Sequence, residues 1–136
     1  MERRFRRDLS SLQDVFQFVS EFLSAHGLDA SNAHDLELIL EELFTNVLKY
    51  RKDGAETVAV RLERNGETIT LSFQEFDVDA FDITKLPEPD LERPASERPI
   101  GGLGIHLIRK LAESVGYEYK DRVSTTTVTK KVGDDV

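Results

Sequence analysis

The sequence contains no cysteine, which excludes disulfide bonds, thiolate nucleophiles and cysteine-ligated zinc or iron–sulfur sites. Apolar runs are short, and none approaches the ~20 residues that a membrane-spanning helix needs. The first ten residues, MERRFRRDLS, lack the apolar stretch of a secretory signal. We therefore expect a cytoplasmic protein that is neither exported nor inserted in a membrane.

Basic residues are in the minority, with 18 Lys and Arg against 26 Asp and Glu and a net charge of −8. A phosphate backbone would be repelled by most of such a surface, so we expect no direct binding of nucleic acid. One local exception is a basic arm near the N-terminus, made of Arg3, Arg4, Arg6 and Arg7. This arm is either a solvated first strand or a frayed end, or else a docking patch for an acidic partner.

With 39% apolar and 32% charged residues, the 136-residue chain is typical of one globular domain, residues 1–136. Apolar residues recur at helical spacing from Leu9 to Ala25 and again from Ser31 or Asn32 to about Tyr50. The expected core stripes are Leu12, Val15, Phe16, Val19, Phe22 and Leu23 in the first helix, and Leu36, Leu40, Leu43 and Val47 in the second.

The middle of the chain alternates between apolar and polar residues on both sides of Asn65-Gly66, which predicts a β-hairpin with alternating residues Val58, Val60, Leu62, Ile69, Leu71 and Phe73. All four prolines fall between Pro87 and Pro99, so we expect a long, mobile lid loop over about residues 83–100. A third helix from Ile105 to about Ser114 and a final strand pair, Val115–Lys120 and Val123–Val132, follow. This order predicts an α/β (α+β) fold, a two-layer sandwich of a mainly antiparallel, mixed sheet with helices on one face.

Two groups of residues suggest chemistry. Glu42 and Asn46 are spaced i and i+4, so they share one face of the second helix. The amide oxygen of Asn46 suits Mg²⁺, and a nearby carboxylate can orient or deprotonate a hydroxyl. Gly101, Gly102 and Gly104 open the third helix, where backbone N–H groups and the helix dipole favour a phosphate. Taken alone, the Glu42–Asn46 pair also fits an exposed polar helix surface. The glycine cluster taken alone also fits a flexible hinge before a helix.

Together, the acidic helix face, the hairpin, the proline-rich loop and the glycine-opened helix resemble the GHKL ATPase family, the ATP-binding module of DNA gyrase, MutL and histidine kinases. The chain resembles in particular the bacterial anti-sigma-factor serine/threonine kinase branch. That resemblance is carried by Leu40-Glu-Glu-Leu-Phe-Thr-Asn-Val-Leu-Lys-Tyr50 and by Gly101-Gly-Leu-Gly-Ile-His-Leu-Ile108, and it extends from about Leu9 to Lys131.

The resemblance implies ATP and Mg²⁺ as ligands. Glu42 would be the base-like catalytic carboxylate and Asn46 the Mg²⁺ ligand. Lys49 and Arg98 would contact phosphate, as would the glycine-box residues Gly101, Gly102, Leu103, Gly104 and Ile105. Thr126 would lie beside adenine, with Thr125 and Thr127 as alternative registers.

In the family, the adenine-binding motif, or adenine box, reads like DxGxxFD. This chain departs from that motif. An ungapped alignment places Phe76 at its aspartate and Val78 at its glycine. With one residue inserted, Glu75 takes the place of the aspartate and Asp77 that of the glycine, so the glycine is missing in both alignments.

By this resemblance, the expected function is a kinase that phosphorylates a serine or threonine of a small antagonist (anti-anti-sigma) protein. It would also sequester a sigma factor in a partner switch, as a homodimer. The alternative is a non-catalytic or weakly nucleotide-binding GHKL module that regulates by sequestering its partner.

Overall fold

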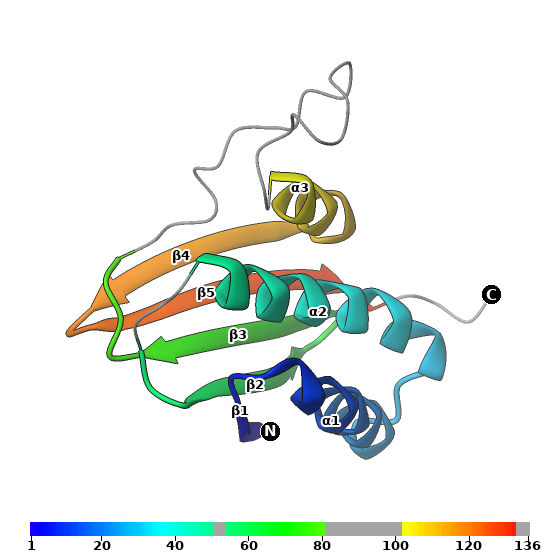
Figure 1. Ribbon diagram of the computed structural model, residues 1–136. Coiled ribbons are helices and arrows are strands. Elements are labelled where there is room, and N and C mark those ends of the chain that lie inside the picture. The colour runs from blue at the N-terminus through cyan, green and yellow to red at the C-terminus, as the bar shows by residue number, and fades with distance from the viewer. Residues whose placement is uncertain (51–53, 81–101, 133–136) are drawn as a thin grey trace.

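The computed structural model describes residues 1–50, 54–80 and 102–132, which form one sheet with helices on a single face (Figure 1). The sheet has five strands in the order β1-β2-β3-β5-β4, and every strand pairing is antiparallel. The elements are β1 (Glu2–Arg6), α1 (Leu12–Ala25), α2 (Ala33–Tyr50), β2 (Thr57–Asn65), β3 (Thr68–Phe76), α3 (Gly102–Leu111), β4 (Ser114–Lys120) and β5 (Val123–Lys131). The expected two-layer α+β sandwich is confirmed, except that the described sheet contains no parallel pair.

The predicted hairpin is present as β2 and β3, joined by a turn at Asn65-Gly66 in which Gly66 has a left-handed φ of 61°. Side chains alternate strictly along β3, so that Ile69, Leu71, Phe73 and Glu75 are buried under the helices. This alternation is the physical basis of the period-two pattern in the sequence, because successive side chains of a strand point to opposite faces.

Each of the first two helices is preceded by a short 3-10 turn that an aspartate caps. The carboxylate of Asp8 accepts from the Ser10 backbone N–H at 2.8 Å, and that of Asp29 accepts from Ser31 at 2.7 Å. The Ser10 hydrogen bond lowers the pKa of the Asp8 carboxyl below its ordinary value. These caps satisfy N–H groups that a helix start leaves without partners.

The predicted core stripes of α1 and α2 are buried, except that Leu12 and Phe16 are only partly buried, and Phe18, Ile39 and Phe44 are buried with them. Phe18 packs edge-on against Phe5 of β1, with ring centroids 5.7 Å apart. Phe44 packs edge-on against Phe73 of β3 at 5.2 Å. The two ring pairs thus attach the helices to the sheet at two places.

Two local features refine the expectation: the structure selects one alternative for the basic arm, and it shifts the third helix. The basic arm is a strand, since β1 pairs with β2 in a register that places Phe5 opposite Val58. The third helix begins at Gly102 and ends at Leu111, about three residues earlier at both ends than predicted. It ends early because the Glu113 N–H donates to the Thr129 carbonyl at 2.7 Å, which draws the chain into β4. Among the described residues, no helix is long and apolar enough to cross a membrane.

Candidate functional site

Polar residues replace the core at one end of the helix-facing side of the sheet, where β3 ends and β5 begins. Glu75, Ser124 and Thr126 are only 8%, 2% and 6% exposed. Glu75 lies directly opposite Ser124, and Phe73 lies opposite Thr126. Buried polar groups are costly unless they find partners, so this end of the sheet differs in kind from the apolar remainder.

The strand register separates the three consecutive threonines of β5. Thr126 points towards the helices together with Ser124, whereas Thr125 and Thr127 lie on the opposite face. Gln74, also on that outer face, donates from Nε2 to the Thr125 hydroxyl at 3.2 Å. Of the three threonines, only Thr126 can therefore face a ligand held under the helices.

Two hydroxyl groups join this site that the sequence did not single out. Ser124 donates from Oγ to the Tyr117 hydroxyl at 2.8 Å, and Tyr117 lies opposite Thr126 on β4. Alternation along β5 would place Ser124 beside Thr126. Only the strand pairing shows that Ser124, and not Thr126, is the hydroxyl directly across from Glu75.

Asn46 is 4% exposed, and its amide nitrogen Nδ2 has no hydrogen-bond partner among the described residues. Glu42 is half-buried one turn earlier on the same helix face. α2 and β3 run in the same direction in Figure 1, and Phe44 packs on Phe73. The polar residues that follow these two rings, Asn46 and Glu75, thus lie towards the same end of the layer.

Asp77, which stands at the missing glycine in the alignment with one inserted residue, has a left-handed backbone. Asp77 has a φ of 54°, a conformation that glycine adopts without steric cost and other residues adopt rarely. Val78, the glycine position in the ungapped alignment, is fully buried. The backbone geometry favours the alignment with one inserted residue, in which Glu75 and Asp77 stand at the aspartate and the glycine.

The sequence from residue 5 to residue 130 matches the family model described as the histidine kinase-like ATPase domain. The chain belongs to this family. The resemblance inferred from the sequence is thereby confirmed, and membership implies an ATP-binding domain.

Solved structures show the same fold. The chain is similar to the RsbU and RsbW domains of Rv1364c from Mycobacterium tuberculosis, with a TM-score of 0.66, 14% identity and 97% of this chain covered. It spans 31% of that longer chain. A comparison with curated proteins finds no match.

Two further structures are similar. The SiaB–SiaC complex from Pseudomonas aeruginosa gives a TM-score of 0.59 and 18% identity over 96% of this chain and 87% of the other. The Acinetobacter baumannii histidine kinase AdeS gives 0.53 and 15% identity over 98% and 68%.

Some predicted site residues of this ATPase domain lie outside the described residues, and others form the start of α3. The loop 83–100, Arg98 and Gly101 lie outside the described residues, as does the side chain of Lys49. The backbone of Gly102, Leu103, Gly104 and Ile105 forms the first turn of α3, which packs against α2. The first N–H groups of a helix have no partner within it, so this turn offers donors to an anion.

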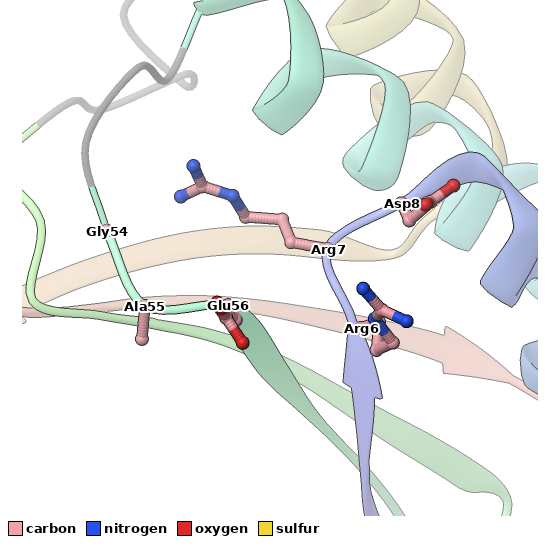
Figure 2. Close-up of a pocket in the computed structure, with 6 residues that line it drawn as sticks. All are labelled: Arg6, Arg7, Asp8, Gly54, Ala55 and Glu56. Atoms are coloured by element: carbon pink, nitrogen blue, oxygen red, sulfur yellow. The ribbon is translucent and has the colours of Figure 1, made fainter.

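A separate cavity of about 250 Å³ lies where β1 leads into α1 and β2 begins, and Figure 2 shows its lining residues, Arg6, Arg7, Asp8, Gly54, Ala55 and Glu56. Gly54 has a φ of 110°, and a Cβ placed there would clash with Arg7 and with Val78 at 2.8 Å. Arginines and carboxylates both line this cavity, and none of the predicted site residues does.

Proposed function

We propose that this ATPase domain binds ATP with Mg²⁺ and acts as an anti-sigma-factor-type protein serine/threonine kinase. Its substrate would be a small antagonist protein, and a sigma factor would be its sequestered partner in a homodimeric partner switch. The observation that carries the proposal is the buried Asn46 amide. Its Nδ2 has no partner in the part of the chain that the structure describes, and it lies at the end of the layer that also holds Glu75.

An unpartnered amide inside a protein is unfavourable, by about 1–3 kcal/mol, unless a ligand or an ordered water satisfies it. Rotating the amide by half a turn exchanges Oδ1 and Nδ2, so Asn46 can offer a donor to phosphate or an acceptor to Mg²⁺. The residue therefore fits the expected ligand. When bound, ATP with Mg²⁺ supplies the transferable γ-phosphoryl group and the charge neutralisation that phosphoryl transfer requires.

We assign Glu42 the role of general base. It lies one turn from Asn46 on the same helix and is half-buried. From there it would accept the proton of an incoming serine or threonine hydroxyl, or hold that hydroxyl in line.

In this proposal, the polar end of the sheet recognises the nucleotide base. The Glu75 carboxylate would accept from the adenine amino group, and the hydroxyls of Ser124 and Thr126 would bind the same edge of the base directly or through water. At the other end of the nucleotide, the backbone N–H groups of Gly102, Leu103 and Gly104 would hold the phosphates. Lys49 and Arg98 remain predicted phosphate contacts.

The partner assignment has independent support from the fold. Two of the similar structures carry RsbW and SiaB–SiaC in their names, and the second is a complex with another protein. A second candidate function is sequestration without catalysis. Asp77 favours it, because a side chain stands where the family's glycine lets the base approach the backbone.

Calorimetric titration with ATP and ADP, with and without Mg²⁺, tests the proposal directly. We expect binding that Mg²⁺ tightens, and in Asn46→Ala we expect that tightening to disappear while the fold is retained. Thr45→Ala is the matched control, since the Thr45 hydroxyl already donates to the Glu41 carbonyl at 2.7 Å.

Transfer of labelled phosphate to a co-encoded antagonist protein separates the two candidates. Binding with transfer supports the kinase, and binding without transfer supports the sequestering module. If the wild-type protein binds no nucleotide at millimolar ATP with Mg²⁺, both the site and the kinase are wrong.

A further inference from the structure

Three residues with left-handed backbone meet at one corner of the sheet. Asp77 follows β3, and Asp121 and Arg122 form the two-residue turn between β4 and β5, with φ values of 54°, 53° and 62°. Figure 1 shows the green segment after β3 beside the tip of this hairpin. Such a turn normally has glycine at its second position, because the Cβ of other residues is crowded in this conformation.

Arg122 bridges the two segments with its whole guanidinium. Nε donates to Asp77 Oδ1 at 2.9 Å, Nη1 to Asp79 Oδ1 at 3.0 Å, and Nη2 to the Asp77 carbonyl at 3.3 Å. The Arg122 carbonyl also accepts from the Val78 N–H at 3.1 Å. We call this set of contacts the Arg122 clasp.

Tyr119 completes the attachment from the same hairpin. Its hydroxyl donates to the Val78 carbonyl at 2.8 Å, and the Val78 side chain is fully buried. Val78 is therefore held through both of its backbone polar groups and its side chain. The two carboxylates raise the pKa of the Arg122 guanidinium further above its ordinary range, so the arginine stays charged at any physiological pH.

The clasp is a poor source of stability. Its charged side chains are all exposed, and solvent screens exposed ion pairs so that they contribute little to stability. The left-handed backbone at Asp77, Asp121 and Arg122 is strained for residues other than glycine. A strained arrangement that does not stabilise the fold indicates a positional role.

What the clasp positions follows from the strand register. Arg122 lies two residues before Ser124, and Asp77 lies two residues after Glu75. The last ladder pair, Phe76 with Val123, is all that separates the clasp from the Glu75–Ser124 pair. Closing this end of the ladder therefore sets the distance between the buried carboxylate and the hydroxyl across from it.

We propose that Arg122 is a positioning residue for recognition of the nucleotide base: it ties the hairpin tip to the segment after β3 and so holds Glu75 and Ser124 at the spacing that selects an adenine amino group. This inference rests on the proposed nucleotide binding. It assigns base preference, and not only affinity, to a residue that makes no contact with the base.

The test uses Arg122→Gly, which removes the clasp and at the same time relieves the left-handed turn. We expect unchanged or higher stability in urea, about three- to tenfold weaker ATP binding, and a smaller ratio of ATP to GTP affinity. Arg122→Lys keeps the charge but cannot reach both carboxylates in fork geometry, so it should recover only part of the preference. Arg61→Ala, which breaks an exposed ion pair with Glu63 on β2, is the control and should leave both affinities unchanged.

The outcomes separate this inference from the proposed function. Wild-type protein that binds no nucleotide overturns the proposed function itself. If the wild type binds ATP and Arg122→Gly has the same ATP and GTP affinities, the positioning role is wrong although the site stands. A uniform loss of both affinities with lowered stability would show a purely structural role and would also overturn the inference.

Discussion

The helix-facing side of β3 and β5 has two halves that share one ladder and one alternation but differ in chemistry. In the first half, Ile69, Leu71 and Val128 are each 1% exposed and pack against the helices. In the second half, Glu75, Ser124 and Thr126 are almost as deeply buried, yet they are polar. Burial of apolar surface stabilises the fold, whereas burial of polar groups is favourable only with partners. The first half therefore stabilises the fold, and the second is the part to which we assign nucleotide binding in our proposal.

The largest effect should come from the apolar half. Leu71→Ala leaves a cavity in the core, and we expect it to lower the free energy of unfolding by about 2–5 kcal/mol. Urea unfolding measures this, with Thr70→Ala on the outer face of the same strand as the control. An equal loss in both variants would show that the inner face of β3 is not the core of the domain.

In the polar half, Glu75→Gln should change binding more than folding. The amide keeps the size of the side chain but replaces an acceptor oxygen by a donor, so ATP should bind about tenfold more weakly. GTP binding should fall less, because an amide N–H can donate to the guanine carbonyl. Calorimetry with both nucleotides checks the ratio. A variant that keeps the wild-type preference would place base recognition on other residues.

Ser124→Ala tests the register within the same half, with a smaller expected effect. Loss of one hydroxyl should weaken ATP about two- to fivefold. Thr127→Ala, on the outer face of β5, should change nothing, because its hydroxyl cannot reach a ligand under the helices. The two affinities are measured side by side. Equal weakening in both variants would contradict the strand register.

The smallest effect concerns a polar residue whose partner lies within the chain. The carboxyl of Asp8 has a pKa lowered by the Ser10 N–H, so its stabilisation is complete at neutral pH and is lost as pH falls below 3.8. Asp8→Asn keeps the cap but does not titrate. Urea unfolding across this range should show that the free energy of unfolding falls slightly less with acid in the variant than in the wild type. The ATP affinity at pH 7 should be unchanged. A change in that affinity would mean that Asp8 belongs to the binding site.

Local patterns in the sequence were enough for most of the fold. Alternation around Asn65-Gly66 predicted β2 and β3, and helical spacing predicted α1 and α2, because these signals arise between residues close in the chain. The glycine cluster and the Glu42–Asn46 pair led to the ATPase family, which the family model confirmed. The sequence left open whether Arg3 and Arg4 lie in a strand. This strand forms by pairing with β2, and its charged residues carry no local strand pattern.

What the tertiary structure decided were relations between distant residues. It placed Ser124, and not Thr126, across from Glu75, and it brought Arg122 to Asp77 and Asp79 over more than 40 positions of sequence. It also left the Asn46 Nδ2 buried without a partner among the described residues. No local pattern contains this information, because strand register and burial are set when the whole sheet closes against its helices. The sequence by itself determined which family this protein belongs to, and the sheet register determined which of its polar residues meet.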